Sequence, residues 1–492
     1  MSDSNLLQLA LLIPLLAVVG IQLTTRWENV REAVSLISAS ALFAVVTELY
    51  PPLLAGDVIA VHWLDVMPGL ALAFRLEPLG LLFALVASFL WIVTTLYAIG
   101  YMRGHGEKNQ TRFFSLFAVS IAAVMGIAFA ENLFTLFVFY EILTLCTYPL
   151  VTHAGTDKAR QGGRVYLSIL LGTSVGFFLL AIVATWLLAG TLSFRPGGIF
   201  SPDTSAALLS VLLVLFVFGV GKAAIMPFHR WLPAAMVAPT PVSALLHAVA
   251  VVKAGVFVLL KVCLLIFGFE TLQSIPATKW LLYLAGASIL LASIVALRQQ
   301  NLKKRLAYST VSQLGYITLG ALLATSAGIT GSALHIVMHA FGKITLFFCA
   351  GAILVAAHKT EVSELRGLGR QMPVTMTAFL IASLCIIGIP PTGGTWSKWY
   401  LMLGTFEADQ WILMVLLMVS SLLSIAYLLP IPLRAFFSSN TPEAAGTLAT
   451  DGAVAIKEAP LPSLIALGIT AAGCIYLLLF PDAFYQLIKA GI

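Results

Sequence analysis

Long apolar runs separated by short polar segments make up most of this chain. A helix that spans a bilayer needs roughly 20 consecutive, mainly apolar residues. By that measure the pattern predicts fourteen spans, over residues 5–23, 32–50, 76–101, 113–130, 133–152, 165–189, 207–238, 241–266, 280–297, 306–325, 333–357, 374–403, 411–437 and 461–480. Spans seven and twelve are long and are interrupted by prolines, which predicts that they are discontinuous helices.

Composition supports an all-α polytopic membrane protein. Apolar residues make up 60% of the chain and charged residues only 10%, whereas about a quarter of a soluble domain is charged. The longest polar linkers, 51–75 and 438–460, are too short to bury a core of their own. We therefore expect a single membrane domain over residues 1–492.

The distribution of Lys and Arg among the loops predicts an orientation. Loops after odd-numbered spans hold most of these residues, whereas loops after even-numbered spans hold only Arg75, Arg195 and Lys279. By the positive-inside rule, the former are cytoplasmic and both termini face outward, across the inner (plasma) membrane. The acidic start has no Lys or Arg before the first apolar run, so we interpret that run as a retained span and not as a cleaved signal peptide.

One carboxylate and one lysine stand out inside apolar spans. Glu141 lies near the middle of span five, and Lys222 lies in span seven, five residues before Pro227. Because a lone charge in the membrane is costly, we expect Glu141 to pair with Lys222. Two roles stay open: a static ion pair that holds two helices together, or a switch in which a moving carboxylate changes how readily the lysine gives up its proton. Buried pairs stabilise poorly, which favours the switch.

Five basic side chains continue this pattern: His247 and Lys253 in span eight, and His335, His339 and Lys343 in span eleven. Their spacing places the first two on different sides of a helix and the other three on one face. Histidine titrates near neutral pH, so we interpret that face as a proton relay. Alternatively, the histidines bond to nearby hydroxyls or carbonyls. Metal binding through HxxxH is a further alternative, but no carboxylate ligand lies near it and the metalloprotease glutamate is absent.

Span twelve repeats the features of span seven. Pro390, Pro391, Gly393 and Gly394 interrupt it, and Lys398 follows the break. Broken segments at corresponding places in two halves are typical of transporters built from repeats, with a site at each break. Because the breaks lie five spans apart, and five is odd, we expect two inverted copies.

Several kinds of site are not supported by the sequence. GVGKAA, around Lys222, lacks the first glycine of a phosphate-binding loop and its final Ser or Thr. The five cysteines lie in apolar segments and never form CxxC, which argues against iron–sulfur ligation and disulfides. The net charge of +6 forms no patch dense enough for nucleic acid. We therefore expect no cofactor.

Four segments, together with the number of spans and Glu141 on span five, resemble a known family. The segments are GKAAIMPFHRWLPAAMVAPTPVSALLHAVAVVKAG, LKKRLAYSTVSQLGY, HIVMHAFGKITLFFCAGAI and IGIPPTGGTWSKWYLM. They resemble the antiporter-like subunits shared by respiratory complex I, Mrp-type cation/proton antiporters and membrane-bound hydrogenases. The resemblance implies spans one to three over about 5–101, two inverted five-helix repeats with discontinuous helices 7 and 12 over about 113–266 and 280–437, and a last span over about 461–480.

The resemblance also implies a proton route along a hydrated axis at mid-membrane. By the family's pattern, the route starts at the Glu141–Lys222 pair and ends at Lys398. His247 and Lys253 bridge the two halves, and the basic residues of span eleven continue the route. Chain length and Lys398 resemble the Mrp D-type subunit, whereas PTPVSALLH and the paired histidines resemble the large subunit.

These observations predict a function in ion transport. We expect a proton-translocating subunit of a multi-subunit monovalent cation (Na⁺)/H⁺ antiporter, a secondary transporter and not an enzyme, which works with other membrane subunits in the bilayer. One alternative is a proton-pumping subunit of a redox complex, either complex I-like NADH:quinone oxidoreductase or a membrane-bound hydrogenase. A third alternative is a scaffold, or a proton module that serves another transporter such as an inorganic-carbon uptake system.

Overall fold

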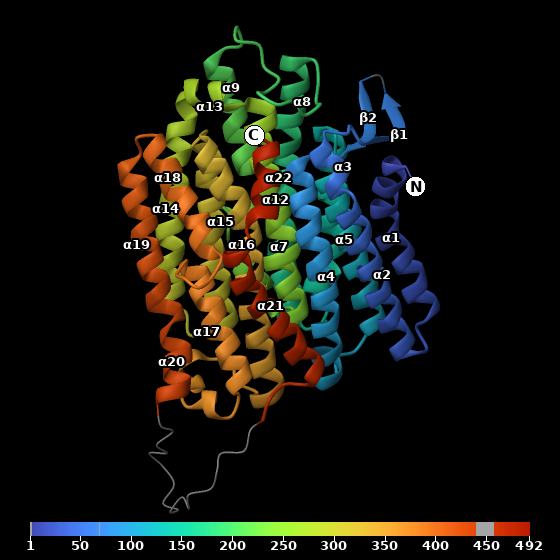
Figure 1. The fold of residues 1–492 in the computed structure, drawn as a ribbon, viewed down its shortest axis with the longest axis vertical. Helices are drawn as coiled ribbons and strands as arrows, with labels where there is room; N and C mark the ends of the chain where they lie inside the picture. The colour runs from blue at the N-terminus through green and yellow to red at the C-terminus, as the bar shows by residue number, and fades with distance from the viewer. Residues whose placement is uncertain (1, 68, 439–456) are drawn as a thin grey trace, which may run out of the picture.

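The computed structural model describes residues 2–67, 69–438 and 457–492, and its helices run side by side along one common direction (Figure 1). Each of the fourteen expected spans coincides with a helix or with a series of helical segments. By length and composition, eleven helices of the described residues are able to cross a membrane. The expectation of an all-α polytopic membrane protein is confirmed.

The N-terminal part contains the one sheet found among the described residues. Its elements are α1 (Asp3–Leu23), α2 (Glu28–Glu48), α3 (Tyr50–Ala55), β1 (Ala60–Met67), β2 (Leu70–Arg75) and α4 (Pro78–Gly104). The antiparallel hairpin β1–β2 lies where the sequence predicts only a polar linker. Phe74 is fully buried and packs edge-on against Trp63, and the Arg75 amide donates to the Phe129 carbonyl at 2.8 Å. The first contact holds the two strands together, and the second fixes the hairpin at one end of the bundle.

The next part contains the first helix break. Its elements are α5 (Gln110–Ala128), α6 (Leu133–Val151), α7 (Asp157–Thr173), η1 (Ser174–Phe178), α8 (Leu179–Ala189), α9 (Ala206–Gly219), η2 (Gly221–Ala223), α10 (Trp231–Ala234), η3 (Ala235–Val237), α11 (Thr240–Ala244), η4 (Leu245–Val249), α12 (Val251–Val262) and η5 (Cys263–Phe267). Helix α9 ends at Gly219, and Ala224 then adopts a φ of 52°, which a right-handed helix does not allow. Span seven is therefore discontinuous, as predicted.

The last part contains the second break. Its elements are α13 (Phe269–Ser274), α14 (Pro276–Arg298), α15 (Leu302–Leu322), α16 (Ser326–Ala357), η6 (Val362–Leu365), η7 (Leu368–Arg370), α17 (Pro373–Ile387), α18 (Gly394–Glu407), α19 (Trp411–Leu428), α20 (Pro430–Phe437), α21 (Leu461–Leu479) and α22 (Asp482–Ala490). Gly388 ends α17 in the left-handed conformation, with a φ of 87°. Five crossings separate the two breaks, so the helices that lead into them run in opposite directions.

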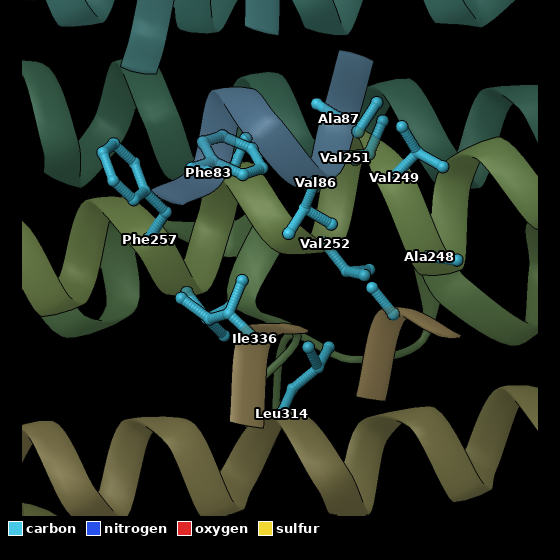
Figure 2. Packing of buried hydrophobic residues seen from close by; sticks show 14 of the residues in the cluster. Phe83, Val86, Ala87, Ala248, Val249, Val251, Val252, Phe257, Leu314 and Ile336 are labelled. Atoms are coloured by element: carbon cyan, nitrogen blue, oxygen red, sulfur yellow. The ribbon is translucent and has the colours of Figure 1, made fainter. Parts of the chain in front are cut away.

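Helices α12 and α16 form the centre of the bundle. Every residue of α12 is buried, and so are nearly all residues of α16. Figure 2 shows the packing around them, with Phe83 of α4 against Phe257 and with Ile336 and Leu314 from α16 and α15 nearby. Lipid tails are as apolar as leucine, so close van der Waals packing holds these helices together. The basic residues of both helices consequently lie far from the surface of the bundle.

Candidate functional site

Lys222 lies in the first helix break and its ammonium contacts α6. It is fully buried. Its Nζ donates to the Tyr140 carbonyl at 2.9 Å and to the Thr144 hydroxyl at 2.5 Å, and it lies 3.1 Å from the centre of the Tyr140 ring. Two oxygen acceptors and an aromatic face therefore replace the water that a lysine loses on burial.

Glu141 was expected to pair with Lys222, but the two side chains do not form a direct ion pair in this structure. No ion pair within 4.0 Å joins them in the described part of the chain, and both carboxylate oxygens of Glu141 are covered without a hydrogen-bond partner. The reason is helical geometry. Tyr140 and Thr144 are four residues apart and face the lysine, whereas Glu141 is turned by about 100° from Tyr140, toward the side where Ile142 is exposed.

Lys253 of α12 reaches across to α16. Its Nζ lies 2.5 Å from Nδ1 of His339, and both side chains are buried. When Lys253 carries its charge it has donors only, so Nδ1 of a neutral His339 ring is then the acceptor. The next histidine along α16, His335, stacks on His339 with 5.8 Å between ring centres. Lys253, His339 and His335 therefore follow one another through the core.

His335 has a partner on each ring nitrogen. Nε2 lies 3.0 Å from Oε1 of Gln313 on α15, and Nδ1 lies 2.9 Å from the hydroxyl of Ser397 on α18. The amide oxygen accepts a hydrogen bond from the Nε2–H group, and a hydroxyl can either donate a hydrogen bond to Nδ1 or accept one from it. The ring therefore has suitable partners both when it is neutral and when it is charged.

Lys398 lies on α18, just past the second break. Its Nζ donates to the Ile387 carbonyl and to the Ser421 hydroxyl, each at 2.9 Å, and lies 4.8 Å from the centre of the Tyr316 ring. The Tyr316 ring also stacks on His335, with 5.7 Å between centres. Lys398 is therefore the next basic group after His335, separated from it by one tyrosine ring.

Lys343 and His247 lie beside this series. Lys343 Nζ donates to the Ser309 hydroxyl at 2.8 Å, and Tyr427 also donates to Ser309, at 3.1 Å. His247 lies in the π-helical turn η4 and packs on Phe347 of α16 with 4.6 Å between ring centres. Both of its ring nitrogens are buried without a hydrogen-bond partner. It therefore touches the second half of the chain by packing alone, whereas Lys253 does so by a hydrogen bond.

Sequence reasoning missed the polar groups that hold these basic residues. They are Thr144, Ser309, Gln313, Tyr316, Ser397 and Ser421. A signal for some of them exists in LKKRLAYSTVSQLGY, where Ser309, Gln313 and Tyr316 recur at helical spacing in a buried helix. The histidines of α16 point to Gln313, Ser397 and Lys253 and share no common centre, so their arrangement does not fit the metal alternative.

Lys261 is a fully buried lysine that was not among the expected site residues. Lys261 of α12 contacts Oε2 of Glu77 at 2.9 Å and donates to the Ala130 carbonyl at 2.6 Å. In the part of the chain that the structure describes, four other membrane-buried lysines hold no carboxylate within 4.0 Å: Lys222, Lys253, Lys343 and Lys398. The nitrogens of the central series are therefore held by neutral oxygens, rings and an imidazole.

Two family models match the sequence. Residues 130–424 match the model described as NADH:quinone oxidoreductase/Mrp antiporter, TM. Residues 63–114 match the model described as NADH-ubiquinone oxidoreductase (complex I), chain 5 N-terminus. The first match covers more than half of the chain and includes both helix breaks and all the basic residues of the centre.

Curated relatives come from both branches that these descriptions name. The N subunit of the NADH-quinone oxidoreductase of Desulforudis audaxviator is 35% identical over 357 residues, which cover 72% of this chain and 70% of that protein. The A/B subunit of a probable K⁺/H⁺ antiporter of Rhizobium meliloti is 35% identical over 373 residues, which cover 73% of this chain but 36% of that protein. The chain thus corresponds to about a third of the length of the second relative.

Two solved structures share the fold. One is the Mrp complex from Dietzia sp. DQ12-45-1b, with a TM-score of 0.86 over 100% of this chain and 97% of that one. The other is the membrane-bound sulfane sulfur reductase, an archaeal respiratory membrane complex, with a TM-score of 0.84 over 99% of this chain and 97% of that one. Each is 22% identical in sequence, so the likeness concerns the fold.

Proposed function

We propose that this chain, which belongs to the NADH:quinone oxidoreductase/Mrp antiporter family, moves protons within a multi-subunit antiporter that exchanges them for a monovalent cation such as Na⁺. The observation that carries the proposal is the series of contacts from Lys253 through His339 and His335 to Ser397, with Lys398 beside it. Ionisable groups inside a membrane are costly, and they are characteristic of ion and proton pathways.

The chemistry of each step is proton exchange between neighbours. Lys253 gives a proton to the free Nδ1 of His339, and the ring releases another from Nε2. A bridging water carries this proton from Nε2, which has no side-chain partner among the described residues, to His335, whose Nδ1 contacts the Ser397 hydroxyl on the side of Lys398. No cofactor is needed, because every group in the series either carries or accepts a proton.

Lys222 is the first group of the proposed route and Glu141 modulates it through space. Both carboxylate oxygens lack a hydrogen-bond partner among the described residues, so its effect on Lys222 would be electrostatic. Lys343 holds the Ser309–Tyr427 pair beside the series, and His247 lies next to Phe347 at the junction of the halves. Both are close enough to the axis for their charge state to influence Lys253.

A second candidate function is supported by the relatedness to the N subunit of an NADH-quinone oxidoreductase. In that case the same axis would work in a redox-driven pump, and partner subunits would supply the electron transfer. Under either function the chain works in the plasma membrane with other membrane subunits, and both of its termini face away from the cytoplasm.

The decisive experiment measures proton flux in inverted vesicles that carry the whole complex, with Na⁺ or K⁺ added and no electron donor. We expect cation-dependent flux that Lys222→Ala and Glu141→Ala abolish, while both variants still assemble. Lys222→Arg fails as well, because arginine does not give up its proton. Lys304→Ala, which changes an exposed lysine at the start of α15, is the matched control and keeps full flux.

Normal flux in both Lys222→Ala and Glu141→Ala refutes the proposed route. Flux that begins only when NADH or another reductant is supplied moves the protein to the redox-pump class.

A further inference from the structure

Lys261 is a buried cation that the proposed route does not use. It lies on α12, two helical turns beyond Lys253, and its side chain is fully buried. Besides the contact with Glu77, its Nζ donates to the Ala130 carbonyl at 2.6 Å and lies 4.0 Å from the centre of the Phe194 ring. Three separate segments therefore converge on one ammonium.

The carboxylate partner connects this lysine with the surface. Glu77 lines a cavity of about 250 Å³, together with Arg75, Phe194, Leu264 and Leu265. The side chain of Glu77 is 16% exposed, whereas that of Lys261 is 0% exposed. Glu77 therefore brings an ionisable group to the cavity and contacts the buried ammonium, and the Phe194 ring also lies next to both.

A second charge pair lies nearer to the solvent at the same end of the bundle. Arg75 and Glu131 form an ion pair at 2.7 Å, and their side chains are 44% and 25% exposed. The charges of Glu77, Glu131 and Arg75 all act on Lys261. Charge is thus arranged in order of decreasing exposure, from Arg75 and Glu131 through Glu77 to Lys261.

An aromatic pair separates this site from the central series. Lys253, Phe257 and Lys261 are spaced i, i+4, i+8 and so share one stripe of α12, with about 12 Å of rise between the two lysines. Phe257 stacks on Phe83 of α4 with 4.8 Å between ring centres, and both rings are fully buried. Figure 2 shows the two rings facing each other. Phe257 therefore lies between the two lysines along this stripe, about one helical turn from each.

We propose that Glu77 and Lys261 form an outer proton-exchange site, which the stacked rings of Phe83 and Phe257 close off from Lys253. The inference rests on the proposed function in one respect: Lys253 belongs to the proton route. Glu77 takes one proton from water in the cavity, Lys261 passes one proton inward when Phe257 moves aside, and the proton on Glu77 then restores the ammonium. The net result is transfer of one proton.

A pair that served only to fasten α12 to α4 would require neither the cavity nor the intervening aromatic rings. Its contribution would also be small, because buried ion pairs stabilise no better than apolar packing of the same volume. If the pair is a proton-exchange site, opening the aromatic barrier should increase proton leak, whereas a purely structural pair predicts no such increase.

The test measures passive proton leak in vesicles that carry the whole complex, without Na⁺, K⁺ or a reductant. We expect Phe257→Ala to raise the leak on the order of tenfold. The matched control is Phe267→Ala, since Phe267 is equally buried near the end of the same helical segment but lies beyond Lys261 and not between the lysines. If Phe257→Ala does not assemble, Phe257→Leu is used, with a smaller rise expected.

The second arm adds Glu77→Gln to Phe257→Ala, which we expect to return the leak to near the wild-type level. Any one of three results overturns the proposal. The first is an equal leak in the Phe257 and Phe267 variants, and the second is no leak in either variant. The third is a leak in Phe257→Ala that Glu77→Gln leaves unchanged. These results are independent of the antiport measurement. If the unaltered complex shows no cation-dependent flux, the proposed function is refuted, but the comparison of leak among the variants still tests the Glu77–Lys261 site.

Discussion

Lys253 and His339 join the two halves of the chain through one hydrogen bond, 2.5 Å between Nζ and Nδ1. The lysine belongs to α12, which ends the first predicted repeat, and the histidine belongs to α16, in the middle of the second. The contact is completely buried. Any proton that passes from one half to the other by way of side chains is therefore expected to use this pair.

His339→Phe should reduce cation-dependent proton flux at least tenfold, because it removes the ring nitrogen that accepts from Lys253 and keeps a ring of similar volume. The measurement is flux in inverted vesicles at equal amounts of assembled complex. His105→Gln changes an exposed loop histidine and should leave flux unaltered. Full activity in His339→Phe would remove the pair from the route.

Gln313→Leu should destabilise the complex and also slow flux. The leucine leaves Nε2 of His335 buried without its acceptor, and a buried group left unpaired costs about 1–3 kcal/mol. The expected result is a lower midpoint of thermal unfolding together with lower flux. Ser397→Ala, on the other ring nitrogen, should behave in the same way. If both variants transport normally, the two hydrogen bonds have no part in proton movement.

Lys261→Met should lower the free energy of unfolding by roughly 3–5 kcal/mol, because it leaves the Glu77 carboxylate beside a buried apolar side chain. Adding Glu77→Gln removes that unpaired charge and should recover most of the loss. Thermal unfolding of the single and double variants provides the comparison. Equal losses in both would mean that the charge of Glu77 has no cost once the lysine is gone.

Stability should fall as the pH drops below about 6.5, in part because of His153, which follows the end of α6. Burial lowers the pKa of His153 from its usual 6.5, and the Arg112 guanidinium adds to this effect against the opposing Lys108 carbonyl. As the pH falls, His153 therefore binds its proton at a higher pH in the unfolded chain than in the folded chain. The contribution of His153 to the free energy of unfolding is complete above about pH 6.5 and is lost as the pH falls through the pKa of His153 in the folded chain.

His153→Gln should reduce the difference between the unfolding midpoints measured at about pH 7.5 and about pH 5.5. Arg164→Gln, an exposed change on α7, is a control that should keep the wild-type difference. An unchanged pH dependence in His153→Gln would assign the effect to other groups.

The sequence predicts the helical architecture well because a bilayer leaves the backbone few choices. Each apolar run must satisfy its own amides and carbonyls, so its length and composition are sufficient to identify a helix. Pro390 and Pro391 likewise identify the second break. The paired strands over residues 60–67 and 70–75 were not predicted, because one short alternating segment is hard to distinguish from a polar linker.

The candidate site was predictable in part. Depth in the membrane follows from position within an apolar run, and so the sequence correctly identifies buried lysines and histidines. Rotation about the helix axis is harder to infer, since one residue corresponds to about 100°. That angle separates Glu141 from the residues that hold Lys222. The sequence does not predict hydroxyl and amide partners such as Ser309 and Gln313, because such residues are also common where membrane helices simply pack together.

The bond from Lys398 to the Ile387 carbonyl makes the lysine a cap for the last turn of α17. The C-terminal end of a helix carries partial negative charge, which a nearby cation stabilises by about 0.3–1 kcal/mol, and by up to about 2 kcal/mol where it is partly buried. A lysine that gives away its proton withdraws that support. Every proton that leaves Lys398 would thus loosen the end of a half-helix, so that charge transfer and backbone movement are two aspects of one event.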